Sequence, residues 1–227
     1  MGEMVEFPSN GGTCPGYLAV PASGSGPGVM VIQEWWGLVQ HIRDVCDRFA
    51  AEGFTALAPD FYHGESTTEP DEAGKKMMAM RMDQAARDMS GAVQFLLADP
   101  RATGDRVGMV GFCMGGGLAL YLASLSPEVA ACVVYYGVIP WPDAQPRLEN
   151  IRAAVLGHFA ENDDMANRET VGALEQRLRA AGVKVEFNWY PGTTHAFFND
   201  TRPEVYNPEA ARQSAERTYA FLRQHLT

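Results

Sequence analysis

A cysteine between glycines is the first feature of this 227-residue sequence that could do chemistry. The motif Gly111-Phe112-Cys113-Met114-Gly115 follows an alternating apolar segment and precedes an alanine- and leucine-rich one. A sharp strand-to-helix turn strains its central residue, and the flanking glycines avoid collisions across the turn. Cys113 would sit at a helix N-terminus, which favours a thiolate and offers N–H groups to an oxyanion. The pattern predicts a nucleophile; the alternative is a glycine loop with an ordinary buried thiol.

Two further positions supply the partners that such a nucleophile needs. Asp163 and Asp164 follow the apolar segment 153–159, and His195 follows the segment 184–190. The chain order of nucleophile, acid and histidine is that of an α/β-hydrolase triad. Asp163 is preferred as the acid for its distance past the strand end, although either carboxylate could instead cap a helix or a turn. The alternative for His195 is a histidine of a surface loop.

The other four histidines are assigned elsewhere. His41 lies on a predicted helix and His225 near the end of the sequence. His158 lies inside a predicted strand, where a hydrogen-bonded core histidine is the preferred interpretation. His63 follows the segment "PDFY" and is placed at the rim of the pocket.

The segments that must position these residues alternate between strand and helix patterns. A hairpin is expected around Ser9-Asn10-Gly11-Gly12, and the segment between 58 and 85, rich in Pro, Gly and Thr, is expected to be a loop. Strands are predicted at 4–7, 13–20, 28–33, 54–58, 106–112, 129–136, 153–159 and 184–190, and helices at 42–50, 85–97 and 208–226. This order predicts one α/β domain over 1–227, with about eight mostly parallel strands and helices on both faces.

The composition of the chain limits the classes of partner and cofactor that are expected. With 28 acidic and 18 basic residues the net charge is −10, and no basic cluster is present, so nucleic acid is not expected as a partner. Apolar runs are short and the first ten residues do not resemble a signal peptide, so a cytoplasmic protein without a membrane partner is expected. The four cysteines form no C-x-x-C pair, which argues against a zinc site or a disulfide framework. No metal or organic cofactor is expected, and the oligomeric state is left open.

Five motifs occur in the order and at the spacing of a known family: "VIQEWWGL", "APDFY", "GFCMGGG", "HFAENDDM" and "GTTHAFFN". Through almost its whole length the chain resembles the dienelactone hydrolase (carboxymethylenebutenolidase) family. The resemblance implies an α/β-hydrolase fold with Cys113 as nucleophile, Asp163 as the acid that orients the imidazole, and His195 as general base and acid. It also implies that Glu34 contacts the resting thiol and helps control its conversion to thiolate.

Glu34 has a physical reason to lie near Cys113. It ends the buried segment "VMVIQ" and is followed by Trp35 and Trp36, so it points into the crevice in apolar company. A carboxylate there opposes thiolate formation, whereas His195 and the helix dipole promote it. The alternative is a surface carboxylate that merely ends a strand.

The oxyanion hole is expected to consist of the backbone N–H groups of Trp35 and Met114. Asn199 occupies the position, four residues after His195, where some members of the resembled family have an arginine. Arg202 lies close by, and Arg81 is in the region of the family's other arginine. Residues expected to bind substrate lie in loops after strand ends or near those arginine positions: Trp36, Phe61, Tyr62, Arg81, Trp141, Phe197, Phe198, Asn199 and Arg202.

The predicted activity is cysteine-dependent hydrolysis of carboxylic esters or lactones through a thioester acyl-enzyme, acting on a small molecule. One alternative is a general carboxylesterase, thioesterase or peptidase of the same fold. The other is a non-catalytic binding protein that keeps the fold.

Overall fold

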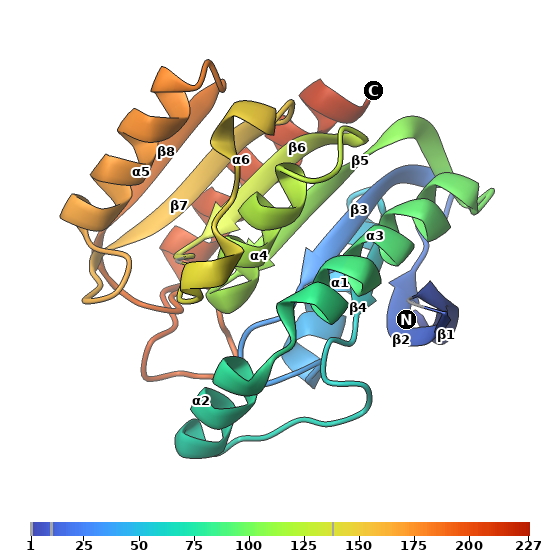
Figure 1. The fold of residues 1–227 in the computed structure, drawn as a ribbon, viewed down its shortest axis with the longest axis horizontal. Helices are drawn as coiled ribbons and strands as arrows, with labels where there is room; N and C mark the ends of the chain where they lie inside the picture. Colours follow the sequence, from blue (N-terminus) through green and yellow to red (C-terminus); the bar gives the residue numbers. More distant parts are fainter. Residues whose placement is uncertain (1, 10, 138) are drawn as a thin grey trace.

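A single eight-stranded sheet organises the protein (Figure 1). The computed structural model describes residues 2–9, 11–137 and 139–227, so Asn10 of the predicted hairpin turn lies outside the described residues. In spatial order the strands are β1 (Glu3–Ser9), β2 (Gly12–Ala19), β4 (Thr55–Pro59), β3 (Gly26–Ile32), β5 (Ala102–Phe112), β6 (Val129–Tyr135), β7 (Ala154–Asn162) and β8 (Val185–Thr194).

The sheet is antiparallel at one edge and parallel elsewhere. β1 pairs with β2 and β2 with β4 in antiparallel fashion, while β4, β3, β5, β6, β7 and β8 run parallel. Central strands are covered on both faces, which is why β4 and β6 are buried along their whole length and read as continuous apolar runs. The predicted α/β-hydrolase class, with eight mostly parallel strands, is confirmed.

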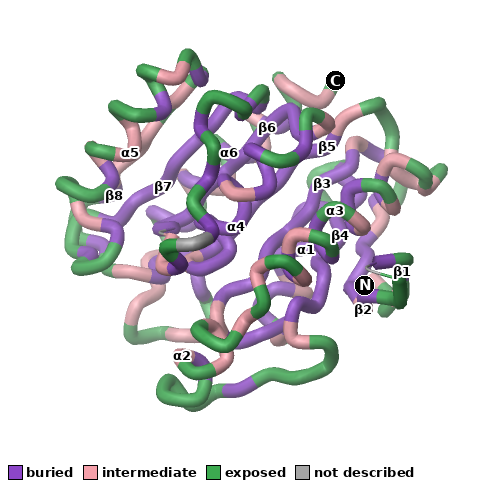
Figure 2. Tube along the Cα trace, viewed as in Figure 1, coloured by how far each residue is buried: buried purple, intermediate pink, exposed green. Residues whose placement is uncertain are grey.

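Five helices cover the two faces of the sheet. α1 (Gln40–Ala51) and α6 (Pro208–Leu226) pack on one face. α3 (Met82–Ala98), α4 (Met114–Ala123) and α5 (Arg168–Ala180) pack on the other. Figure 2 shows the strands buried between helices whose outward surfaces are exposed. The predicted helices at 42–50, 85–97 and 208–226 correspond to α1, α3 and α6.

A further helix, α2 (Pro70–Ala79), corrects the prediction of a loop between β4 and α3. Pro70 at its first turn and the acidic Asp71 and Glu72 are ordinary helix-start signals. Because Ala73 is its one buried residue, α2 lacks the apolar periodicity that predicted α1, α3 and α6. It lies beyond the end of the sheet in Figure 1, where it can contribute to the site rather than to the core.

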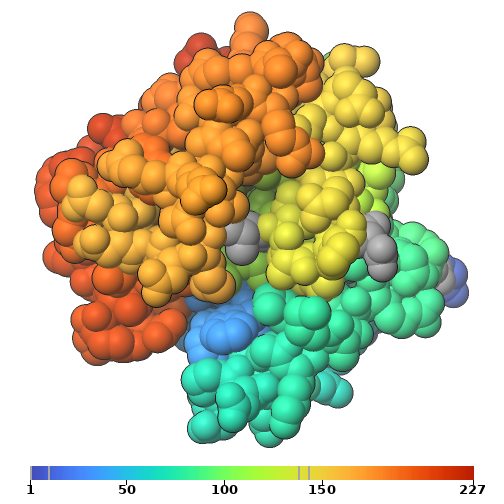
Figure 3. Space-filling model, turned by 60° about the vertical axis from the view of Figure 1, so that its left-hand side comes forward, coloured from blue at the N-terminus to red at the C-terminus, as the bar shows by residue number. Residues whose placement is uncertain are grey.

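Segments far apart in the sequence converge beyond the carboxyl ends of the parallel strands. In Figure 3 the segment after β3 (blue), α2 (teal) and the segment after β7 (light orange) meet on one face of the molecule. The carboxyl ends of parallel strands are the usual place for a ligand site in an open α/β sheet.

Candidate active site

Cys113 occupies a strained turn between β5 and α4. Its φ is 54° and its ψ −120°, a conformation that L side chains rarely adopt. A Cβ on Gly111 would lie 1.9 Å from the carbonyl oxygen of Gly115, and a Cβ on Gly115 would lie 2.5 Å from the carbonyl oxygens of Ile32 and Gln33. Only glycine allows these backbones to meet, so the turn lifts a half-buried Cys113 above the sheet edge.

Asp163, which is buried, and His195, which is partly buried, form a charge-assisted pair. Nδ1 of His195 lies 2.7 Å from Oδ2 of Asp163. The other carboxylate oxygen, Oδ1, accepts hydrogen bonds from the backbone N–H groups of Met165 and Ala166 at 2.9 and 3.0 Å. Burial acts to raise the pKa of Asp163, but the hydrogen bond with His195 and these backbone donors lower it below its usual value. Asp164 is exposed, so of the two candidate carboxylates only Asp163 reaches the histidine.

The electrostatic surroundings of His195 favour its protonated form. Burial alone lowers the pKa of the imidazole, but the hydrogen bond with Asp163 and the interaction with Cys113 outweigh it and raise that pKa to about 10. Within the described part of the chain, Nε2 of His195 has no hydrogen-bond partner of normal geometry. Free enzymes often hold catalytic groups slightly apart until substrate binds. The ring is therefore held by Asp163 at one nitrogen and is available on the Cys113 side.

Glu34 is buried beside the same cavity and is held by two neutral groups. Asn199 donates its side-chain N–H to Oε2 of Glu34 at 2.8 Å, and the Tyr136 hydroxyl donates to Oε1 at 3.4 Å. Only 1% of Glu34 is exposed, which excludes the alternative of a surface carboxylate. The hydrogen bonds of Glu34 thus go to Asn199 and Tyr136, while Cys113 lines the same cavity.

Two backbone N–H groups are available next to Cys113. Met114 is the first residue of α4, and Trp35 follows β3; within residues 2–9, 11–137 and 139–227 neither backbone N–H has a hydrogen-bond partner. The hydroxyl of Tyr62 donates to the carbonyl oxygen of Trp35 at 3.1 Å and lies 3.7 Å from Sδ of Met114. Tyr62 therefore braces both residues that carry the free N–H groups.

A cavity of about 100 Å³ lies over these groups. Its wall is largely apolar, and among the described residues that line it only Arg202 carries a fixed positive charge. The lining residues are Glu34, Trp35, Trp36, Met77, Cys113, Met114, Pro140, Met165, His195, Ala196 and Arg202. The structure thus brings together the four residues expected to be catalytic, the two expected oxyanion donors, and Trp36 and Arg202 of the expected substrate-binding set.

Arg202 and Trp36 also line a second, larger cavity of about 360 Å³, together with Asn199. The guanidinium of Arg202 lies over the ring of Trp36, 5.6 Å from its centroid. These two side chains therefore form a shared wall between the small cavity over Cys113 and the larger one.

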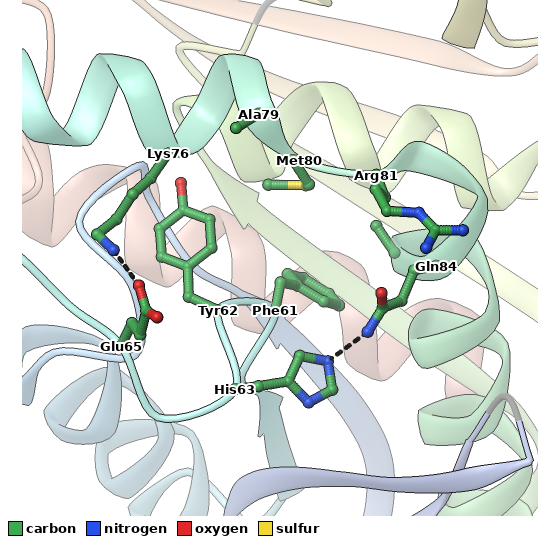
Figure 4. A pocket seen from close by; sticks show the side chains of 10 residues that line it. Phe61, Tyr62, His63, Glu65, Lys76, Ala79, Met80, Arg81 and Gln84 are labelled. Carbon is green, nitrogen blue, oxygen red and sulfur yellow. Dashed lines mark hydrogen bonds and ion pairs between the residues drawn. The ribbon is translucent and has the colours of Figure 1, made fainter.

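Several residues expected to bind substrate lie elsewhere. Phe61, Tyr62 and Arg81 line a separate cavity of about 270 Å³ between the loop after β4 and α2 and α3 (Figure 4). Its floor and rim include the ion pair between Lys76 and Glu65. Phe61 and Arg81 thus do not reach the cavity over Cys113, and Tyr62 reaches that site only through its hydroxyl.

Three aromatic residues expected in the pocket have structural positions instead. Phe197 and Phe198 are buried in the core, where Phe198 packs against Phe112 with ring centroids 5.2 Å apart. Trp141 is buried and donates its Nε1–H to the carbonyl oxygen of Met77 at 3.1 Å, which holds the end of α2. Large rings after strand ends fill the core in preference to a small cavity, because burial of their area is favourable.

Sequence reasoning missed five residues of the site. Met77, Pro140, Met165 and Ala196 line the cavity over Cys113, and Tyr136 donates a hydrogen bond to Glu34. Tyr136 directly follows β6 and has a φ of 39°, and its place at a strand end was an available signal. Met77 lies on α2, whose sequence has little apolar periodicity and therefore gives no signal for a residue facing the site.

His158, expected to be a core histidine, is fully buried in β7. Its Nδ1 lies 2.8 Å from the Tyr190 hydroxyl and its Nε2 3.0 Å from Oγ1 of Thr218. Burial lowers its pKa to about 3, so it is neutral, and the prediction is confirmed. Among the described residues, no helix combines the length and the apolar character needed to span a membrane.

Comparisons with known proteins agree with this geometry. The model of the dienelactone hydrolase family matches residues 14–226. "Protein usf" of Aquifex pyrophilus is 42% identical over 236 residues, and a "Putative carboxymethylenebutenolidase" of Aquifex aeolicus is 39% identical over 233; both alignments cover 100% of each chain. A solved "Putative Dienelactone Hydrolase" from Klebsiella pneumoniae subsp. pneumoniae MGH 78578 has a TM-score of 0.90 and 29% identity, with 99% of each chain covered. The chain therefore belongs to the dienelactone hydrolase family and is a hydrolase acting on ester or lactone bonds.

Proposed function

We propose that this enzyme cleaves its ester or lactone through a thioester formed on Cys113, with His195 and Asp163 completing the triad. The observation that carries the proposal is the 2.7 Å pair of His195 and Asp163 in the same cavity as the strained Cys113. The raised pKa of His195 supports an imidazolium that can stabilise a neighbouring thiolate.

The reaction then follows from the positions of these groups. The Cys113 sulfur attacks the carbonyl carbon, and the oxyanion accepts hydrogen bonds from the N–H groups of Trp35 and Met114. His195 gives its Nε2 proton to the leaving alkoxide as the carbon–oxygen bond breaks, which leaves a thioester. His195 then takes a proton from water, the water oxygen attacks the thioester, and the sulfur leaves. In a lactone the alcohol stays attached to the product.

Glu34 is proposed to oppose thiolate formation in the free enzyme and to yield when substrate arrives. Its carboxylate lines the cavity with Cys113, where a negative charge disfavours a second one. Among the described residues, the side chains that donate hydrogen bonds to it, Asn199 and Tyr136, are neutral and do not cancel its charge.

The dimensions of the site support a small acyl group. The cavity over Cys113, at about 100 Å³, is much smaller than the cavity of about 360 Å³ with which it shares Trp36 and Arg202. The larger cavity beyond Trp36 and Arg202 gives the leaving group or an anionic substituent room next to a guanidinium. We therefore propose a small-molecule ester or lactone with a short acyl part, turned over without a metal or organic cofactor.

Two measurements test the proposal. A panel of p-nitrophenyl acetate, butyrate and octanoate, acyl thioesters and unsaturated lactones should show turnover that falls steeply with acyl length. Intact-protein mass spectrometry during turnover should detect an acyl adduct that maps to Cys113 and is absent from Cys113→Ala. An adduct on another residue would refute the mechanism, and preference for octanoate would refute the small acyl group. Turnover of peptides alone would favour the peptidase alternative.

A further inference from the structure

A second group of cysteine, histidine and aspartate lies away from the catalytic cavity. Cys14 comes from β2, His63 from the loop after β4, and Asp88 from α3. One possible ligand atom of each, the sulfur, a ring nitrogen and a carboxylate oxygen, lies within 4.8 Å of the other two. Three segments that are distant in the sequence therefore present metal-ligating atoms to one point.

Asp88 carries the charge of this group in an almost fully buried position. It is 2% exposed, and its oxygens contact the hydroxyl of Ser9 and Nε2 of His63, the latter at 3.0 Å. Within the described residues, no lysine or arginine pairs with it. A buried carboxylate without a fixed positive partner is costly, so this position favours a cation.

His63 is held in an unusual way at the mouth of the group. Its φ is +50°, in the left-handed region, and its side chain is 34% exposed. Its Nε2 lies 3.0 Å from Oδ2 of Asp88 and 3.1 Å from the side-chain nitrogen of Gln84 (Figure 4). One ring nitrogen cannot donate to the carboxylate and also accept from the amide. Turning the Gln84 amide over, which interchanges its oxygen and nitrogen, removes the conflict and directs an oxygen toward Nε2 of His63.

Cys14 cannot be the nucleophile of a second triad. It is fully buried, and burial raises the pKa of its thiol to about 12, with the Asp88 charge adding to the effect. The thiol lies 3.4 Å from the carbonyl oxygen of Pro15 and 3.8 Å from that of Asp60. A sulfur that substrate cannot reach is suited to a structural role, and thiolate is a preferred ligand of zinc.

We propose that Cys14, His63, Asp88 and Gln84 bind one zinc ion. Bond lengths of 2.0–2.3 Å place neighbouring ligands of a tetrahedral zinc site about 3.3 to 3.8 Å apart. The separations of 3.0 and 3.1 Å around His63 are close to this range, and the Cys14 sulfur lies within 4.8 Å of the His63 and Asp88 ligand atoms. Binding releases the Cys14 thiol proton to solvent and moves the His63 proton to Nδ1. The ion with one thiolate and one carboxylate is then neutral.

The site has an access route and a structural consequence. His63 and Gln84 both line the 270 Å³ cavity of Figure 4, through which an ion can enter. The ion would tie β2 and α3 to the loop after β4, which also carries Tyr62. Tyr62 contacts Trp35 and Met114, so the zinc site would stiffen the support of the proposed oxyanion donors without touching substrate.

Cobalt(II) is the probe, because a thiolate ligand gives bound Co²⁺ a near-ultraviolet charge-transfer band that zinc lacks. Metal-free protein from chelator dialysis is titrated with Co²⁺ and then with Zn²⁺. Wild type should bind one Co²⁺ per chain with this band, and Zn²⁺ should abolish it. Because Cys113 also lies beside a histidine and an aspartate, Cys113→Ala is the first control, and it should keep the band.

Cys14→Ser should lose the band, whereas Cys132→Ser, which alters another buried thiol, should keep it. His63→Ala changes a partly exposed loop residue and should weaken zinc binding at least about tenfold. This variant tests the zinc site if Cys14→Ser does not fold. Either of two results overturns the proposal: wild type that binds no stoichiometric Co²⁺, or a band that persists in Cys14→Ser and disappears in Cys113→Ala.

Discussion

Replacing Asp163 by asparagine tests the proposed triad most directly, because the two carboxylate oxygens have different partners. Oδ1 accepts from the backbone N–H groups of Met165 and Ala166, whereas Oδ2 accepts from His195. An amide accepts hydrogen bonds only through its oxygen, so the two backbone donors hold that oxygen in place of Oδ1. The NH₂ group then faces Nδ1 of His195, and the ring must carry its proton on Nε2. Such a ring cannot accept the Cys113 proton.

The size of the effect follows from this tautomer. Asparagine in place of the aspartate of a serine-protease triad lowers kcat by about 10⁴-fold, which is about 5 kcal/mol of activation free energy at 1.36 kcal/mol per decade. The side chains have nearly the same shape and both backbone hydrogen bonds are kept, so the fold should survive. The pKa of His195 should fall from about 10, because the hydrogen bond with Asp163 is the largest cause that raises it.

The assay compares kcat and kcat/KM of wild type, Asp163→Asn and Asp164→Asn on p-nitrophenyl acetate, with NMR titration of the His195 ring. Asp164 is exposed and its side chain makes no hydrogen bond among the described residues, so its variant should stay within about twofold of wild type. Asp163→Asn activity above about a tenth of wild type, or a larger loss in Asp164→Asn, would show that the acid has been assigned wrongly.

Three further predictions use other features of the site. Cys113→Ala should lower kcat by at least about 10³-fold and Cys113→Ser should leave low but measurable turnover, both measured on the same ester. The pKa of His195 is raised from 6.5 to about 10, so protonated His195 should stabilise the fold fully below pH 6.5 and progressively less as pH rises through 10. In urea unfolding, the difference in free energy of unfolding between wild type and His195→Gln should therefore shrink over that pH range. Gly111→Ala should lower the free energy of unfolding by at least about 2 kcal/mol, because its Cβ would lie 1.9 Å from the carbonyl oxygen of Gly115. The control is Gly172→Ala on α5, whose Cβ would have nothing within 4 Å. In the same measurement it should leave the free energy of unfolding unchanged or raise it by up to about 1 kcal/mol.

The fold could be predicted because its strands and long helices bury apolar residues in regular patterns. β3 and β6 are buried over almost their whole length, β5 is buried from Val107 onward, and α1 and α3 place apolar residues on one face. Neither α2 nor α5 was predicted, because α2 buries one residue and α5 buries two. Apolar periodicity in a sequence reflects burial, so a helix that buries few residues shows little of that periodicity.

The residues at the centre of the site were predictable for a different reason. Cys113, Asp163 and His195 each follow a strand directly, and a parallel sheet brings such positions to one edge. The walls depend on side-chain direction, which strand ends do not determine; Phe197 turned to the core, while Met165, three residues past β7, faces the cavity. The group of Cys14, His63 and Asp88 could not be predicted from the sequence, because these residues form no motif of regular spacing and meet only through tertiary packing.

The position of the Cys113 sulfur and the shape of the cavity wall depend on different parts of the chain, so evolution can change one without the other. The sulfur of Cys113, the proposed nucleophile, is positioned by main-chain atoms, with Gly115 packed against the carbonyl groups of Ile32 and Gln33. The wall of the cavity proposed to take the acyl group comes instead from side chains such as Met77 and Met165, on segments outside that contact. Replacing those methionines can reshape the space offered to a substrate while the reacting atoms stay where they are, so selection for a new ester can begin from a catalyst that is already assembled.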